Sequence, residues 1–269
     1  MSTRAASAFG LTDDELQVVG SRLGVTEFPT VLAVRPRHGT VEALARATDL
    51  ATGQLAARGL IGSDGVDTEL AEMVTALRRP AREIAIRLVT PDGLARISLV
   101  QTGFMCVAAR WIGNGLQLRA IDSHTGIAGA VIAELPASQP AAVEPFSAPA
   151  TDLAECLSGG HSATFFTDRL RALGAGHQVA SALGSAFAAR IAFAEIVCHV
   201  LDAAADRVVR VPGAVAVFYT KRGRLVSAPS VSPSGQLWTT IKPGSDHRVM
   251  QAISQLAELT PSGWEGDAR

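Results

Sequence analysis

The chain has 269 residues, a formal net charge of −1, and 48% apolar residues. At roughly 150 residues per domain, this length allows one large domain or two small ones, and the apolar content supports a substantial core, which excludes a disordered chain. The near-zero charge argues against a general binder of nucleic acid or anionic membranes, because both need an excess of Lys and Arg.

Helices dominate the first 80 residues. Thr12 followed by Glu15 is the signature of a capping box, and Gly24 suits the end of the same helix. Brief alternation between Pro29 and Pro36 predicts a strand. The elements expected here are a helix ending at Gly24, a strand over residues 31–35, a helix over 40–58 with Leu44 and Leu55 facing inward, and a helix over 67–79 that Pro80 stops.

An antiparallel meander follows the helices. Pro91-Asp92-Gly93 and Gly113-Asn114-Gly115 are hairpin-type turns, so consecutive strands should pair with each other. The predicted strands cover residues 83–89, 95–101, 104–110 and 116–121, and a helix over about 126–135 closes this half.

Residues 136–151 contain four prolines and are the best candidate for a linker. The second half then repeats the plan of helices, a meander and one helix. Its predicted helices cover residues 162–173, 177–192 and 245–259, and its predicted strands cover 195–201, 207–211, 214–220, 224–228 and 236–241.

The repeated plan predicts an α+β fold with pseudo-two-fold symmetry. Each half would have an exposed sheet edge, and pairing the halves would remove both edges. We therefore expect one central, mostly antiparallel sheet flanked by N- and C-terminal helical bundles. The expected domain is single and covers residues 8–262, with pseudo-repeats at about 11–135 and 152–260 and a mobile tail over 263–269.

Signals of cellular location point to the cytoplasm. No apolar run approaches the roughly 20 residues that span a bilayer, and residues 1–10 lack the apolar core of a signal peptide. Cys106, Cys156 and Cys198 form no CxxC pair, which fits free thiols in a reducing compartment. We expect no insertion into membranes.

Motifs for catalysis, cofactors and metals are absent from the sequence. It contains no Walker A motif, no GxGxxG opening a helix, no HExxH and no GxSxG. Cys198 and His199 are adjacent on a predicted strand, so they point to opposite faces and cannot share a metal directly. We therefore expect no enzyme activity, no cofactor and no metal site.

Four further features have both a structural and a functional interpretation. The loop 158–162 could bind an anion, but a flexible loop with Ser162 as helix cap explains it better. The cluster Lys221-Arg222-Gly223-Arg224 is typical of a solvated hairpin tip, and turn or helix-start preferences explain Asp92 and Asp246. Phe165-Phe166 point about 100° apart on a helix, so either both are core residues or one faces a partner.

Several motifs, taken in order, resemble one protein family. They are Leu11-Thr12 with Glu15-Leu16, Val31-Leu32, Arg58-Gly59-Leu60, Val66-Asp67-Thr68-Glu69-Leu70, Arg79-Pro80 with Arg82-Glu83, Val107-Ala108-Ala109-Arg110, Val217-Phe218 with Arg222-Gly223-Arg224, Ser227-Ala228-Pro229-Ser230, Ser232-Pro233-Ser234-Gly235-Gln236, Leu237-Trp238, Pro243-Gly244-Ser245-Asp246-His247-Arg248 and Pro261-Ser262-Gly263. This pattern, over about residues 11–263, resembles the EspG family of type VII (ESX) secretion-associated chaperones.

The resemblance implies a pseudo-two-fold α+β fold and a function. Family members bind the helical tip of the PPE subunit of a cognate PE–PPE heterodimer in the cytosol and keep the pair soluble before export. The contact surface implied here is the sheet, the loop over residues 90–94 and the helix over 162–173. The residues it implies are Pro91, Asp92, Leu94, Phe165, Phe166 and Leu170, and a weak homo-oligomer stays open as a further assembly.

Two other functions remain as alternatives. An enzyme with a cryptic site around His161 and Ser162 would need a pocket with a base within hydrogen-bond reach of Ser162. A small-ligand-binding α+β protein would need a closed apolar cavity between the sheet and the helices. A broad, open apolar surface would favour the chaperone.

Overall fold

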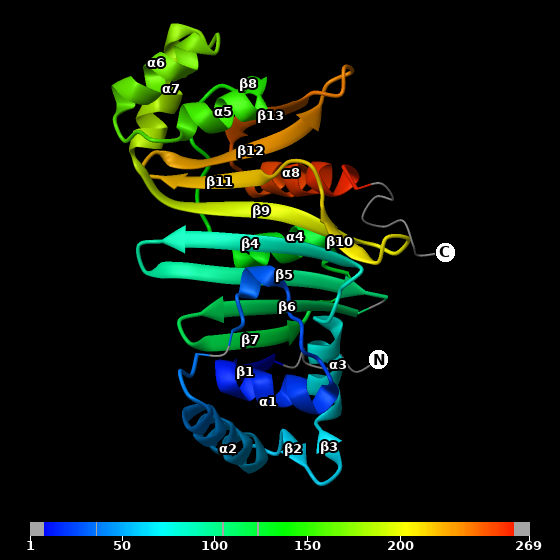
Figure 1. The fold of residues 1–269 in the computed structure, drawn as a ribbon. Coiled ribbons are helices and arrows are strands. Elements are labelled where there is room, and N and C mark those ends of the chain that lie inside the picture. The colour runs from blue at the N-terminus through cyan, green and yellow to red at the C-terminus, as the bar shows by residue number, and fades with distance from the viewer. Residues whose placement is uncertain (1–7, 36, 104, 123, 261–269) are drawn as a thin grey trace. The chain divides into compact units, whose positions relative to one another are not determined.

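The structure is a computed structural model that describes residues 8–35, 37–103, 105–122 and 124–260. It has the predicted α+β class, with helices and a large antiparallel sheet (Figure 1). The chain divides into two units that interleave along the sequence. Unit 1 comprises residues 1–85, 94–126 and 200–209, and unit 2 comprises residues 86–93, 127–199 and 210–269. The single domain with two pseudo-repeats stays a prediction.

The helices of unit 1 begin where the caps are predicted. In α1 (Asp13–Leu23), the Glu15 N–H donates to Thr12 Oγ1 at 3.2 Å, and the Thr12 N–H donates to Glu15 Oε2 at 2.8 Å. This confirms the capping box, and Gly24 ends the helix with φ of 66°. The other helices of this unit are α2 (Val41–Ala57), capped by Thr40, and α3 (Thr68–Ala76), capped by Asp67.

The strands of unit 1 are antiparallel and pair in the order β1-β7-β6-β5. Their bounds are Ala8–Thr12 for β1, Gly93–Thr102 for β5, Met105–Ile112 for β6 and Gly115–Ala120 for β7. Leu16, Leu55, Leu70 and Trp111 belong to one buried cluster, so the helices cover this part of the sheet. A small separate sheet pairs β2 (Ile61–Gly62) with β3 (Gly65–Val66). The strand β4 (Arg82–Thr90) contributes residues to both units.

In unit 2 the strands pair antiparallel in the order β9-β11-β12-β13-β8. The bounds are Phe146–Pro149 for β8, Arg190–Asp202 for β9, Val215–Thr220 for β11, Gly223–Val231 for β12 and Leu237–Pro243 for β13, and β10 (Arg207–Arg210) pairs with β9.

The remaining α-helices belong to unit 2, except that Gly126 of α4 belongs to unit 1. Their bounds are Gly126–Glu134 for α4, Ala150–Leu157 for α5, Ala163–Ala172 for α6, His177–Ala188 for α7 and Asp246–Glu258 for α8. The helices α5, α6 and α7 share a buried cluster with Phe218, Leu225 and Ile241. The helix α8 contacts β11 and β12 and contributes no residue to that cluster. Val249, Ile253 and Leu256 of α8 are buried, as predicted.

Two predictions for the first 60 residues are wrong. Residues 31–35 form no strand, because a 3-10 helix (Thr30–Leu32) ends at Ala33 in the left-handed region and packs Leu32 into the core. Leu44 is 38% exposed, because only Ala51 and Leu55 of α2 are buried. The inward stripe of α2 is therefore confined to its C-terminal half.

The proline-rich stretch 136–151 is packed within unit 2 and is not a simple linker. Its strand β8 pairs with β13, and the Ala141 N–H donates to the Arg224 carbonyl at 2.9 Å. Pro149 is tolerated in β8 because the outermost strand of a sheet has backbone groups that need no partner strand, and the other prolines of the stretch precede the strand. The helix α5 and the strand β1 were not predicted, and α7 ends at Ala188 because β9 begins at Arg190.

Some predictions fall outside the described residues. Phe104, the expected first residue of a strand, and the tail 263–269 both lie there. Within the part of the chain that is described, no helix is both long and apolar enough to cross a membrane.

Candidate functional site

Unit 2 carries an open groove of about 770 Å³ on one face of its sheet. Residues from α5, β9, β11, β12 and β13 line it, together with the segment 210–214. Small residues form much of its floor, namely Gly213, Ala214, Ala216 and Ser227. A groove that is open along a sheet face suits a protruding segment of another protein better than an enclosed small molecule.

The strand register explains why the sheet is hollow at this point. Ala216 of β11 lies opposite Ser227 of β12 and, on its other side, opposite Glu195 of β9. Two small side chains therefore meet in the middle of the face, while larger side chains flank them. Ser227 Oγ accepts the Ala216 N–H at 3.0 Å, so this polar atom already has a partner in the floor.

Aromatic rings form one wall of the groove. The ring centroids of Phe193 and Phe218 lie 5.3 Å apart, and Phe218 also packs edge-on against Phe187 at 5.0 Å. Phe187 and Phe218 are buried, whereas Phe193 is half-buried and faces the groove. Leu153 and Leu157 of α5 are among the apolar residues that line the groove elsewhere. Aromatic and aliphatic walls of this kind are typical of sites that hold an apolar anchor.

Charged side chains stand at the mouth of the groove. Arg210 Nη2 lies 3.8 Å from Glu195 Oε1, and Arg87 Nη1 lies 3.9 Å from Glu195 Oε2. The Arg87 and Arg210 side chains are 61% and 56% exposed, so each pair is weak and screened by solvent. Arg190 also lines the groove.

The predicted loop over residues 90–94 is a tight turn between β4 and β5. Pro91 and Asp92 are exposed and Leu94 is half-buried. In unit 2, β4 neighbours β9, and the Arg87–Glu195 contact places Arg87 on the face that carries the groove. Val89 lies two residues further along the same strand, on the same face, and is exposed. The turn thus follows a strand that extends the groove face.

Phe165 lies at the surface of α6 in a fixed orientation. Its ring is half-buried and packs against the core of unit 2, the Arg169 guanidinium carbon lies 4.7 Å from the ring centroid, and Phe166 packs edge-on at 5.4 Å. A Cβ on Gly160 would lie 2.0 Å from a ring atom of Phe165, so the ring depends on glycine at that position. An aromatic held in place in this way loses little freedom on binding.

Phe166 and Leu170 do not form a surface, which corrects their expected role. Phe166 is 1% exposed and Leu170 is 0% exposed, and both belong to the core of unit 2. The physical reason is the angle of about 100° between successive helical residues, which turns Phe166 inward while Phe165 stays at the surface. Neither side chain can touch a partner in this conformation.

The loop 158–162 has the structural role that the sequence favoured. Ser162 Oγ accepts the Phe165 N–H at 3.1 Å and so caps α6, while His161 is exposed. Among the described residues, no group of His, Cys, Asp and Glu is arranged to hold a metal. Cys198 is buried beside the half-buried His199, as the strand pattern predicts.

Arg224 is wrongly predicted as part of a solvated hairpin tip. Lys221 and Arg222 are exposed, but Arg224 is only 1% exposed. Its guanidinium donates to Asp246 Oδ1 and to the carbonyls of Gly244 and, at 3.5 Å, Pro136. The side chain therefore ties β12 to the start of α8, and Asp246 has a partner as well as a favourable helix position.

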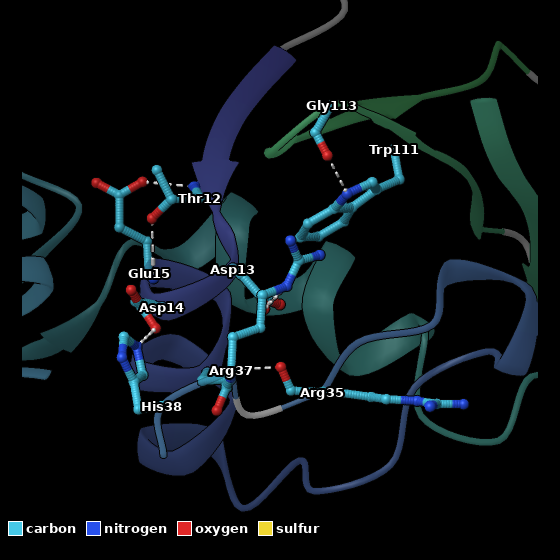
Figure 2. A network of polar contacts seen from close by, with 10 residues as sticks. Thr12, Asp13, Asp14, Glu15, Arg35, Arg37, His38, Trp111 and Gly113 are labelled. Carbon is cyan, nitrogen blue, oxygen red and sulfur yellow. Dashed lines mark hydrogen bonds and ion pairs between the residues drawn. The ribbon is translucent and has the colours of Figure 1, made fainter. Parts of the chain in front are cut away.

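Unit 1 has a separate polar network that fixes the segment leading to α2 (Figure 2). Arg37 Nε lies 2.9 Å from Asp13 Oδ2, and His38 Nε2 lies 2.8 Å from Asp14 Oδ1. The Arg37 guanidinium carbon lies 5.7 Å from the centroid of the Trp111 ring. Burial raises the pKa of the Asp13 carboxyl, and the charge of Arg37 opposes that shift. These contacts stabilise the start of α1 and suggest no chemistry.

The sequence did not reveal the groove. Small and large residues alternate over 214–218, but this pattern predicts only a strand and not a groove. Pairing with Ser227 and Glu195 is needed before the small residues mark a hollow.

Comparison with known proteins gives consistent matches over nearly the whole chain. The model of the family described as EspG family matches residues 12–255. The chain is 29% identical over 266 residues to the ESX-1 secretion-associated protein EspG1 of Mycobacterium tuberculosis (strain ATCC 25618 / H37Rv), covering 94% of this chain and 87% of that protein. It is 24% identical over 261 residues to the ESX-3 secretion-associated protein EspG3 of Mycolicibacterium smegmatis (strain ATCC 700084 / mc(2)155), covering 96% of this chain and 88% of that protein.

The solved structure of a type VII secretion chaperone shares the fold. The Mycobacterium tuberculosis type VII secretion system chaperone EspG5, solved in complex with the PE25-PPE41 dimer, superimposes with a TM-score of 0.80 at 18% sequence identity. The match covers 97% of this chain and 99% of that chain.

Proposed function

Because this chain belongs to the EspG family, we propose that it is a cytoplasmic chaperone that binds the helical tip of the PPE subunit of a cognate PE–PPE heterodimer. Binding keeps the secreted pair soluble until type VII export. The proposal includes no catalytic step and no cofactor. Its support is the fold shared with EspG5, which was solved with a PE25-PPE41 dimer, and the open apolar groove in unit 2.

The groove is the observation on which the proposal depends. A helical tip presents apolar side chains at its turn, and such a patch is prone to aggregation when it is exposed. Phe193 and Leu157 are half-buried and offer a surface for those side chains, and the small floor at Ala216 leaves room for them. Covering the tip stabilises the soluble heterodimer by mass action.

The residues expected from the sequence occupy different places in this proposal. Pro91, Asp92 and Leu94 belong to the turn that follows Val89, and they would extend the contact beyond the groove. Phe165 would contribute from α6, where its ring is partly exposed. Phe166 and Leu170 would support that helix from the core without touching the client.

Co-purification tests the proposal directly. The chain would be co-expressed with each PE–PPE pair encoded in its source genome and analysed by size exclusion, and a stable 1:1:1 complex with one pair is expected. Failure of the folded chain to form a complex with every pair would contradict the proposal.

A variant that fills the floor tests whether the groove is the docking site. Ala216→Trp places a large ring where the sheet is hollow, so it should abolish the complex while the melting midpoint stays near that of the wild type. Ala45→Trp on the exposed side of α2 is the matched control and should bind normally. Full binding by Ala216→Trp would move the docking site away from the groove.

A further inference from the structure

We propose that the basic mouth of the groove, where Arg190 lies at the start of β9 and Arg87 and Arg210 flank Glu195 further along it, selects clients that carry a carboxylate beside the apolar tip. This inference rests on the proposed chaperone function and names the chemistry by which the groove distinguishes one client from another. It concerns residues of unit 2 alone.

The charge at the mouth is unbalanced. Arg87 and Arg210 share one carboxylate, that of Glu195. Arg190 lies five residues earlier in β9, opposite Thr220 of β11, and so about 16 Å from Glu195 along the strand. Glu195 divides its two oxygens between Arg87 and Arg210, at 3.9 and 3.8 Å, which is near the outer limit for an ion pair. Arg87 and Arg210 therefore have further N–H groups that can donate hydrogen bonds to a second carboxylate.

Arg190 is the least satisfied of the three. It is exposed, it lines the groove, and within the described part of the chain no carboxylate lies within ion-pair distance of it. The turn at Lys221 and Arg222 adds positive charge nearby, because the Lys221 N–H donates to the Ala189 carbonyl at 3.0 Å. The potential at this end of the groove is therefore positive.

An occupant without charge would fit this mouth poorly. It would remove water from Arg190 without offering a partner, and desolvating an unpaired charge is costly. A carboxylate at the edge of an apolar tip would instead accept hydrogen bonds from the planar guanidinium fork, which matches its geometry. Clients with similar apolar tips would then differ in affinity through this one charge.

Charge reversal at Arg190 tests the inference with the full chain and the PE–PPE pair that co-purifies with it. Arg190→Glu should weaken binding by roughly tenfold or more, the scale expected for charge pairs at interfaces. Wild-type affinity should fall as salt is raised, and the variant should lose most of that dependence. Arg46→Glu on α2 makes the same change of net charge at an exposed site outside the groove and should bind like wild type.

A reciprocal change in the client completes the test. Each Asp or Glu of the PPE helical tip would be changed to Arg in turn, and one such client should bind Arg190→Glu better than it binds wild type. If Arg190→Glu binds the pair as tightly as the wild type does, with the same salt dependence, the inference is overturned while the chaperone function stands. If the wild type binds no pair at all, the chaperone function itself fails.

Discussion

Phe165 and Phe166 are adjacent in α6 but differ in burial. Changing each to alanine therefore tests which of the two side chains stabilises the core and which is available to a partner. Phe166 is 1% exposed and packs against Phe187 with ring centroids 5.9 Å apart. Removing a ring from such a site typically costs about 3–5 kcal/mol, the sum of lost transfer energy and a residual cavity. Phe165→Ala removes a half-buried ring and its contact with Arg169, so we expect a smaller cost of about 1–2 kcal/mol.

Urea denaturation followed by circular dichroism measures both costs on the purified chain. At about 2–4 °C per kcal/mol, Phe166→Ala should also lower the melting midpoint by roughly 10 °C, whereas Phe165→Ala should lower it by only a few degrees. Client binding should show the opposite order at a temperature where both variants are folded, with the larger loss in Phe165→Ala. Equal stability of the two variants would refute the assignment of Phe166 to the core.

Two further predictions concern buried charge. Arg224→Ala should cost about 3–5 kcal/mol, because it leaves the carbonyls of Gly244 and Pro136 without a donor, whereas Asp246→Asn should cost about 1 kcal/mol or less at its exposed site. Urea midpoints compare the two, and equal midpoints would contradict the tie between β12 and α8. Burial raises the pKa of Asp13 above 3.8, so folded Asp13 binds its proton more tightly than the unfolded chain does, and stability should fall as pH rises from 3.8 through that raised pKa. Asp13→Asn removes this pH-dependent contribution to stability. If the urea midpoint of the variant changes with pH as that of the wild type does, Asp13 does not cause the pH dependence.

Much of the local structure could be predicted from the sequence because its signals lie within a few residues of one another. Thr12, Thr40, Asp67, Ser162 and Ser245 each cap a helix at the predicted start. The hairpin turns likewise gave the meander of β4 to β7, since glycine and proline restrict the backbone where they stand. The order of short motifs also identified the EspG family, which the family model confirms.

The positions of the candidate residues could be predicted only in part. The sequence predicts the turn at Pro91, but it could not separate the half-buried Phe165 from the fully buried Phe166, because both are equally apolar and lie on the same helix. Residues 31–35 likewise show that local pattern does not determine how a segment packs. Their alternation suits a strand, yet a strand needs a partner, and these residues pack Leu32 into the core as part of a 3-10 helix instead.

The sequence by itself determined the α+β class, the helix caps, the turns and the family, because each depends on residue order or on neighbours within one turn of chain. Only the tertiary structure decided that Arg224 is buried, that residues 146–149 add a strand, and that Ala216, Ser227 and Glu195 meet in one hollow. Those outcomes depend on pairings between residues far apart in the sequence, from 11 residues for Ala216 and Ser227 to 95 for Phe146 and Ile241. Whether a small side chain leaves a groove or disappears into a core is set by the neighbours that pairing brings, and composition does not specify them.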